Sequence, residues 1–181
     1  LPASMELVFD NLGWRERFIG KGLLLKSLPV ESGNIYIAYD RFFESLGYRV
    51  LDAGSKTKHK ISRAIIIPGA RMVHRIIPAS VIADIVFQLE ENDIETCIVV
   101  LEGESINLPL GIDVKRLPRS FDALIAAIQA SELVISADSL PSHLSEFLDV
   151  PVFVSTPAPK PYWLPRSAYL ENGWASFADI H

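Results

Sequence analysis

The chain has 181 residues, of which 49% are hydrophobic and 22% are charged, a composition typical of a globular protein with a full core. Its formal net charge of −5 disfavours binding to nucleic acid or anionic lipid, except through a local basic patch. The single cysteine, Cys97, excludes an intramolecular disulfide framework and any zinc site built from several cysteines. No apolar stretch reaches the roughly 18 residues of a membrane span and no signal peptide is recognisable, so we expect a protein of the reducing cytoplasm.

The first 60 residues are less regular than the rest and predict an extension rather than a domain of their own. Residues 34–38 fit either a strand or the start of a helix, and residues 40–46 fit a helix that ends at Gly47. The basic stretch that follows, a solvated loop or an anion site, comprises Lys56, Lys58, His59, Lys60 and Arg63. We therefore expect an irregular N-terminal segment over residues 1–60 and one compact domain over residues 61–181.

From residue 63 onward, short β-branched runs alternate with longer runs of helical periodicity. The strand-like runs cover residues 63–67, 96–101, 133–136 and 150–154. The helix-like runs, with apolar residues three or four apart, cover residues 78–91, 121–130 and 141–149. This order favours parallel strands joined by right-handed crossovers. The sequence therefore predicts an α/β fold, a Rossmann-like parallel sheet with helices on both faces.

Ligands of such sheets bind beyond the carboxyl ends of the strands, so the loops at that edge are the first place to look. These loops are predicted at residues 68–75, 102–105, 137–143 and 155–165. The last of them is rich in proline and predicts an extended loop without a regular helix or a central strand. The apolar stretch around Trp174 and Phe177 is expected to pack back onto the domain.

The most informative segment is Asp138-Ser139-Leu140-Pro141-Ser142-His143, where the third predicted strand gives way to the third predicted helix. Unpaired backbone N–H groups and the helix dipole make such a helix start suitable for an anion such as phosphate. Asp138 suits the hydroxyls of a sugar, whereas His143 can donate to a sugar or to a phosphate. The alternative interpretation is structural: Ser139 or Asp138 caps the helix, and His143 is a satisfied surface group.

Two other turns carry candidate ligand contacts. Pro68-Gly69-Ala70-Arg71 would let backbone approach a ligand closely, and a guanidinium group can hold a diphosphate at two points. Glu102 and Glu104 follow the second predicted strand, where a carboxylate can accept hydrogen bonds from ribose hydroxyls or face solvent. The sequence contains no Gly-x-Gly-x-x-Gly and no P-loop pattern. Its histidines and carboxylates lack the spacing of metal ligands, so no metal is expected.

Taken together, three stretches resemble the C-terminal half of glycosyltransferase family nine, the ADP-heptose:lipopolysaccharide heptosyltransferase group. Residues 65–78 are similar to the family's strand, Pro-Gly-Ala loop and helix entry, and residues 120–136 to the elements before its donor loop. Residues 138–152 match its signature Asp-Ser/Thr-Gly-x-x-His-Leu…Gly-Val-Pro-Val, with Leu140 in place of the first glycine. The family's Phe-Gly-Pro-Thr loop is replaced by Val154-Ser155-Thr156-Pro157. The resemblance spans about residues 61–165.

This resemblance implies one half of a GT-B fold, the half that holds the nucleotide-sugar donor, and an inverting, metal-independent reaction. It implies seven donor contacts: Gly69, Ala70, Arg75, Glu104, Asp138, Ser139 and His143. The first three would line or meet the phosphates, and Glu104 (or Glu102) would bind the ribose. Asp138 and His143 would contact the donor sugar, Ser139 would hold the diphosphate, and residues 117–118 would lie near the base.

We therefore expect the donor-binding domain of a family-nine-like glycosyltransferase of bacterial lipopolysaccharide or surface polysaccharide synthesis. Its substrate would be a nucleotide-sugar, for which an ADP-linked sugar is one candidate, with no cofactor, metal or nucleic acid partner. The family's acceptor site and catalytic base lie in an N-terminal domain, so this chain alone would bind the donor without transferring it. We expect it in the cytoplasm, with the inner face of the inner membrane as one option.

Two alternatives remain open. A degenerate Rossmann-like domain that serves as a non-catalytic interaction module is favoured by Leu140 and by the altered proline loop. The other alternative is a different GT-B-type enzyme, such as a nucleotide-sugar epimerase, which would interconvert sugars without an acceptor.

Overall fold

The computed structural model describes residues 33–45, 47–49, 60–159 and 161–177. The chain divides into two compact units, Leu1–Ala53 and Gly54–His181. The basic stretch noted above lies largely outside the described residues, since its positions 56–59 are not among them.

The described part of the first unit contains helix α2 (Ile35–Ser45). Just before the helix, the side-chain Oδ1 of Asn34 accepts a hydrogen bond from the backbone N–H of Tyr36 at 2.9 Å. After the helix, Gly47 has a φ of +85°, a left-handed conformation that is common where helices end. The helix predicted to stop at Gly47 is therefore confirmed, and residues 35–38 begin it rather than form a strand.

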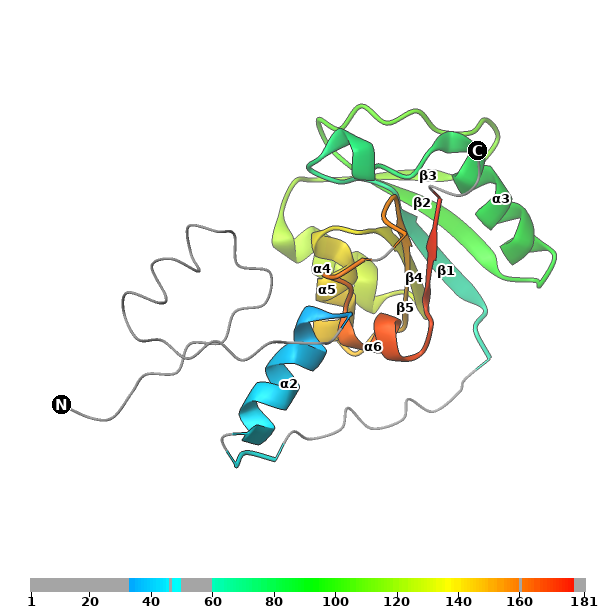
Figure 1. Cartoon of the computed structure of the whole chain (residues 1–181). Helices are drawn as coiled ribbons and strands as arrows, with labels where there is room; N and C mark the ends of the chain where they lie inside the picture. Colours follow the sequence, from blue (N-terminus) through cyan, green and yellow to red (C-terminus); the bar gives the residue numbers. More distant parts are fainter. Residues whose placement is uncertain (1–32, 46, 50–59, 160, 178–181) are drawn as a thin grey trace. The chain divides into compact units, whose positions relative to one another are not determined.

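Six parallel strands of the second unit form one sheet in the order β3-β2-β1-β4-β5-β6 (Figure 1). The strands are β1 (Arg63–Ile67), β2 (Glu95–Leu101), β3 (Val114–Leu117), β4 (Leu133–Ala137), β5 (Val152–Thr156) and β6 (Trp174–Ser176). This is the doubly wound order of a Rossmann-like sheet, in which the chain moves outward from the centre in two directions. The predicted α/β fold with a parallel sheet is confirmed.

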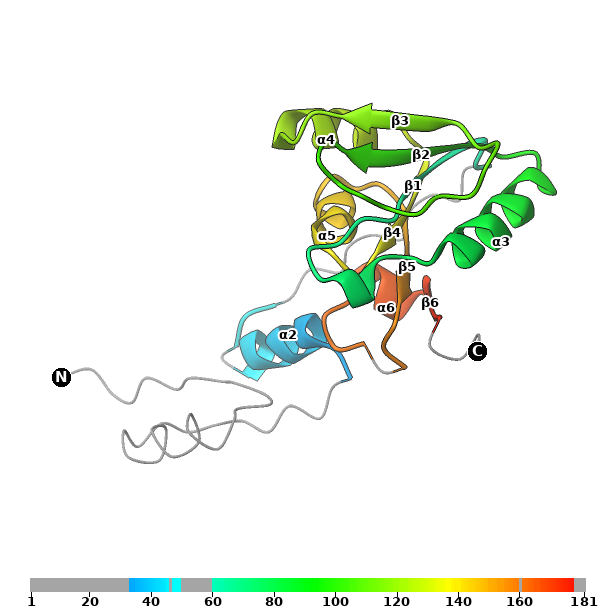
Figure 2. The same ribbon diagram turned by 90° about the horizontal axis from the view of Figure 1, so that it is seen from above.

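Helices cover both faces of the sheet. Helix α3 (Ala79–Glu90) connects β1 to β2, after a short 3-10 helix η1 (Val73–Arg75). Helices α4 (Phe121–Gln129) and α5 (Leu140–Phe147) connect β3 to β4 and β4 to β5. Figure 2 shows α3 on one side of the strands and α5 on the other.

The core consists of two apolar layers, one on each face of the sheet. Ile66 of β1 packs with Ile82 of α3 in one layer, whereas Ile65 packs with Ile128 of α4 in the other. Successive side chains of a strand point to opposite faces, so the run of isoleucines in β1 supplies both layers. This is why the central strands read as continuous apolar runs rather than as alternating ones.

Two edge strands and one helix were not predicted. β3 and β6 are short strands at the two ends of the sheet. Helix α6 (Arg166–Leu170) begins directly after Pro165, where the carboxylate of Glu146 accepts hydrogen bonds from the N–H groups of Arg166 and Ser167 at 2.8 Å each. Phe177 is buried in the layer beneath α3, so the expected return of the tail onto the domain is confirmed.

Within the described ranges, no helix is both long enough and apolar enough to cross a bilayer.

Candidate functional site

The loops after β1 and β4 meet at the carboxyl edge of the sheet. These two strands are neighbours, with Ile67 opposite Ser136, and the chain winds away from them toward β2–β3 on one side and β5–β6 on the other. Such a switch point leaves a crevice where ligands of doubly wound sheets bind. A pocket of about 360 Å³ lies there, and we call it the edge pocket.

Six of the seven predicted donor contacts line the edge pocket: Gly69, Ala70, Arg75, Glu104, Asp138 and Ser139. They come from the loops after β1, β2 and β4, which are far apart in the sequence and adjacent in the sheet. The seventh, His143, lies in the first turn of α5 and does not line the pocket. A contact between His143 and a donor sugar therefore stays a prediction.

Arg75 and Asp138 form an ion pair at the wall of the edge pocket. The Nη1 atom of Arg75 lies 3.4 Å from the carboxylate Oδ2 of Asp138 and donates a hydrogen bond to its backbone carbonyl at 3.3 Å. The aspartate side chain is 10% exposed and the arginine side chain 35% exposed. Two contacts from one nitrogen hold the guanidinium group in place, and its remaining N–H groups can bind an anionic ligand.

Ser139 ties the loop after β4 to the loop after β1. Its hydroxyl donates a hydrogen bond to the carbonyl oxygen of Gly69 at 3.1 Å. Ser139 stands at the N-cap position of α5, but its side chain accepts no N–H of the helix, so the interpretation of Ser139 as a cap is wrong. Leu140, the first helical residue, lines the pocket, so the start of α5 lies at the pocket wall. Pro141 has no N–H and the N–H of Ser142 donates to the carbonyl oxygen of Ser139 at 3.1 Å, so among the first three helical residues the N–H of Leu140 is the one available to a ligand.

Glu104 lies directly against the backbone of Gly69. A Cβ atom added to Gly69 would stand 2.7 Å from Oε2 of Glu104, so a larger residue would displace this carboxylate. The carboxylate is also anchored, because Oε2 accepts the backbone N–H of Leu101 at 3.1 Å. Glu102, the alternative ribose contact, is exposed. It lines neither the edge pocket nor the smaller adjoining pocket described below.

The two ends of α5 differ in how they keep the signature pattern. Leu140 replaces its first glycine, and this side chain is 51% exposed within the lining of the edge pocket. Asp149, which replaces the second glycine, has a φ of +59°, the left-handed conformation that glycine adopts most easily. The conformation at the C-terminal end of α5 is thus the one that the signature glycine would adopt. At the N-terminal end, Leu140 makes the wall of the edge pocket bulkier than a glycine would.

Burial lowers the pKa of His143 below the ordinary value of 6.5, although the carboxylates of Asp138 and Glu146 act in the opposite direction. The imidazole is therefore neutral at neutral pH, when it can act as one hydrogen-bond donor and one acceptor.

A smaller pocket of about 290 Å³ adjoins the edge pocket, and we call it the side pocket. The two pockets share Gly69, Ala70, Arg71 and Glu104, and the side pocket adds Ile76, Ser105, Ile106 and Arg119. Arg119 is not among the predicted site residues, because β3, which ends just before it, was not predicted. The four residues of β3, Val114-Lys115-Arg116-Leu117, do not alternate between apolar and charged, so the sequence carries no clear strand signal there.

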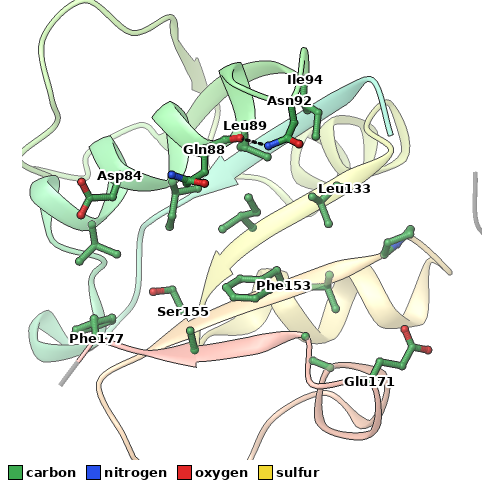
Figure 3. Close-up of a pocket in the computed structure, with 18 of the residues that line it drawn as sticks. Asp84, Gln88, Leu89, Asn92, Ile94, Leu133, Phe153, Ser155, Glu171 and Phe177 are labelled. Carbon is green, nitrogen blue, oxygen red and sulfur yellow. Dashed lines mark hydrogen bonds between the residues drawn. The ribbon is translucent and has the colours of Figure 1, made fainter. Parts of the chain in front are cut away.

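A larger pocket of about 640 Å³ lies on the face of the sheet that α3 covers only in part (Figure 3). We call it the apolar groove; it lies between α3 and strands β4, β5 and β6. Leu133 and Phe153 contribute apolar side chains to it, while Asp84 and Glu171 lie at opposite ends of the view. The residues that line it include no arginine, lysine or histidine. Binding sites need polar groups that converge on the ligand, so the edge pocket is the better candidate.

The described part of the chain contains no group of three or more histidine, cysteine or acidic side chains that could hold a metal ion. Burial, together with the nearby carboxylate of Asp113, raises the pKa of the Cys97 thiol above 9.0. A thiol that stays protonated at neutral pH is a poor nucleophile. The loops of the candidate site supply arginine, carboxylate and hydroxyl groups.

The sequence matches no protein-family model and no curated protein. Among solved structures, the chain is similar to the E. coli heptosyltransferase WaaC with ADP-2-deoxy-2-fluoro heptose, at 14% identity and a TM-score of 0.49 over 84% of this chain and 51% of that one. For WaaC with ADP the identity is 16% and the TM-score 0.48, over 76% of this chain and 49% of that one. The chain is also similar to the iron-containing dodecameric glycosyltransferase TibC of enterotoxigenic E. coli H10407. The identity is 12% and the TM-score 0.47, over 64% of this chain and 34% of that one.

The chain thus spans about half the length of WaaC. Similarities at this level concern the fold alone, so any function has to be supported by the residues of the pocket themselves.

Proposed function

We propose that this domain binds the nucleotide-sugar donor of a glycosyltransferase in the edge pocket. One observation carries the proposal: the guanidinium group of Arg75 and the start of α5, with the N–H of Leu140, lie on the wall of one pocket at the switch point of the sheet. A helix start and a bidentate guanidinium group are two of the strongest phosphate binders in proteins. Together they suit the diphosphate that joins a nucleoside to a sugar.

The carboxylates of the pocket fit the two sugars of such a ligand. Glu104 lies over the Gly69 backbone and can accept hydrogen bonds from the ribose hydroxyls. Asp138 keeps its carboxylate beside Arg75 and can accept hydrogen bonds from the hydroxyls of the transferred sugar. The lack of a side chain at Gly69 leaves the space that the carboxylate of Glu104 occupies, so this carboxylate lies close to the backbone of the loop after β1.

In the reaction, an acceptor hydroxyl would attack the anomeric carbon of the donor. The new glycosidic bond would form as the bond between that carbon and the diphosphate breaks, and the acceptor proton would pass to a base outside this domain. Arg75 and the start of α5 would stabilise the negative charge that develops on the departing diphosphate. This chain alone would bind the donor without transferring it.

The sequence resemblance to family nine supports a place in bacterial lipopolysaccharide or surface polysaccharide synthesis, on the cytoplasmic side of the inner membrane. The saccharide or lipid-linked acceptor would bind another domain.

The test is a calorimetric titration of the chain with UDP, GDP, CDP and ADP, repeated on Arg75→Ala. A hydrogen bond to a charged group contributes about 1.5–3 kcal/mol. We therefore expect the substitution to weaken the tightest nucleotide by about tenfold or more. Arg116→Ala removes an exposed arginine that lines none of the three pockets, and it should bind as tightly as the unchanged chain. Flat titrations with every nucleotide would contradict the proposal.

One observation favours the second candidate function, a non-catalytic interaction module. The side chain of Leu140 lies in the edge pocket, where the signature has glycine. If this side chain has closed the site, the unchanged chain will bind no nucleotide and Leu140→Gly will bind one. The donor-binding proposal expects binding by both, with several-fold higher affinity for Leu140→Gly.

A further inference from the structure

The face of the sheet that carries the apolar groove is covered less completely than the opposite face. On the opposite face, side chains of α4, α5 and α6 form one apolar layer with β4 and β5. Val154 of β5 belongs to that layer and is fully buried, whereas its neighbour Phe153 lines the groove and is half-buried. Among the described elements, α3 is the helix of the groove face, and it packs mainly on β2. An apolar strip on β4, β5 and β6 is thus left without a described helix over it.

The uncovered strip has the dimensions of one helix. β4, β5 and β6 are neighbouring strands, and strands lie about 4.8 Å apart, so the outer two are about 10 Å from each other. A helix with its side chains is about 10 Å across. β4 and β5 have five residues each and extend about 17 Å, the length of about 11 helical residues. One helix of about three turns would therefore cover the strip.

The groove offers such a helix an apolar floor and an apolar wall. Ile135, Phe153 and Ala175 come from the three strands and form the floor. Ile85 and Leu89 of α3 lie one turn apart and form the wall. Figure 3 shows Phe153 in the middle of the groove. The stripe of apolar side chains on an amphipathic helix is the surface that fits a groove of this kind.

The charged groups at the groove have one sign. Asp84 of α3 and Glu171 after α6 are exposed and lie toward opposite ends of it (Figure 3). No arginine, lysine or histidine is among the lining residues, so the complementary helix carries cations beside its apolar stripe. A second copy of this chain would bring the same two carboxylates and a formal net charge of −5, which disfavours it as the occupant.

We infer that the apolar groove is a docking site for a partner protein, which inserts one amphipathic helix with lysine or arginine residues beside its apolar stripe. The helix would lie over β4 to β6 alongside α3 and complete the helical layer of this face. Asp84 and Glu171 would pair with its cations, and Phe153 would pack beneath its apolar stripe. The groove and the edge pocket share no lining residue, so helix docking is testable separately from nucleotide binding.

The experiment measures the binding of two synthetic peptides to the full 181-residue chain by fluorescence anisotropy. Both peptides have about 14 residues, a side-chain staple that keeps them helical, and the same leucine stripe, flanked by lysine in one and by glutamate in the other. We expect the lysine peptide to bind at least about tenfold more tightly than the glutamate peptide. Asp84→Lys/Glu171→Lys should reverse this preference. Ala175→Trp places a bulky side chain at an exposed position of the floor and should weaken both peptides by about tenfold or more.

The matched control is Glu102→Lys/Asp122→Lys, which changes the net charge equally at exposed positions that line none of the three pockets. It should keep the preference for the lysine peptide. A loss of preference as large as in the groove variant would mean that the peptide responds to the overall charge, which would overturn the inference. Equal affinity for both peptides, or binding of neither, would also overturn it. A dimer of the unchanged chain that Ala175→Trp dissociates in sedimentation would assign the groove to a second copy instead.

Discussion

The edge pocket is smaller than the apolar groove, but it gathers more charged groups at one point. The groove measures about 640 Å³ and the edge pocket about 360 Å³. Yet the edge pocket brings an arginine, two carboxylates and a helix start to one point, whereas the groove is lined mainly by apolar side chains of α3 and three strands. We propose the edge pocket as the ligand site because of its converging polar groups, although its volume is the smaller of the two.

The topology of the sheet explains both hollows. Because the chain winds outward from β1 and β4 in opposite directions, no crossover passes over the carboxyl ends of these two strands, and the edge pocket stays open. Helices α4 and α5 pack on the face opposite to α3. Among the described elements, α3 is therefore the helix that flanks the groove along β4 to β6, with α6 at its edge.

Among the substitutions considered, we expect the largest loss of stability at the boundary of the groove. Ile135 of β4 is 4% exposed, lines the groove and belongs to the core layer beneath α3. We expect Ile135→Ala to lower the free energy of unfolding by about 2–5 kcal/mol, since buried methyl groups are lost and a cavity remains. Urea unfolding followed by circular dichroism measures this.

The conservative Ile135→Val should cost about 0.5–1.5 kcal/mol, and it should leave nucleotide affinity unchanged. Loss of nucleotide binding in this folded variant would place the ligand in the groove, which would contradict binding in the edge pocket.

Glu146 links the helix that carries the edge pocket to the helix beside the groove. From α5 its carboxylate accepts the N–H groups of Arg166 and Ser167 at the start of α6, each at 2.8 Å. Pro165 at the N-cap has no side-chain group that could replace it. We expect Glu146→Ala to lower the free energy of unfolding by about 1–2 kcal/mol, the usual cost of losing a helix cap.

The control for this variant is Glu90→Ala, an exposed glutamate at the end of α3. Equal destabilisation by both substitutions would argue against the capping role of Glu146.

The smallest expected effect concerns pH and His143. Because burial lowers the pKa of this imidazole in the folded state, the unfolded chain binds its proton more readily. Its contribution to stability is complete above pH 6.5, its ordinary pKa, and is lost as the pH falls below that value. His143→Gln should therefore flatten the decline in stability on acidification, which unfolding curves at a series of pH values would reveal.

The matched control is the exposed His74→Gln, which should retain the dependence of the unchanged chain. If the free energy of unfolding of His143→Gln falls with decreasing pH as steeply as that of the unchanged chain, His143 is not the source of this pH dependence.

The central part of the fold was predictable because its strands are long apolar runs. β1, β2, β4 and β5 are buried on both faces and carry a strong signal, as do the amphipathic helices between them. The edge strands β3 and β6 have four and three residues, too few for a pattern to be recognised. Helix α6 was missed because its cap comes from Glu146, which is distant in the sequence.

The candidate site was predictable as far as it depends on strand ends. Gly69, Glu104 and Asp138 each follow a predicted strand, so parallel strands necessarily bring them to one edge. Arg119 follows a strand that was not predicted, and the hydrogen bond from Ser139 to Gly69 requires the register of β1 and β4. The apolar groove depends on which face each helix covers, which periodicity does not reveal.

An amide NMR titration of the isotope-labelled chain with UDP, GDP, CDP and ADP decides whether a nucleotide binds in the edge pocket. The edge pocket predicts saturable shifts at Gly69, Ala70, Ser139 and Leu140, and none at Ala175 of the groove. Shifts confined to the groove, or no shifts at all with any of the four nucleotides, would contradict donor binding in the edge pocket.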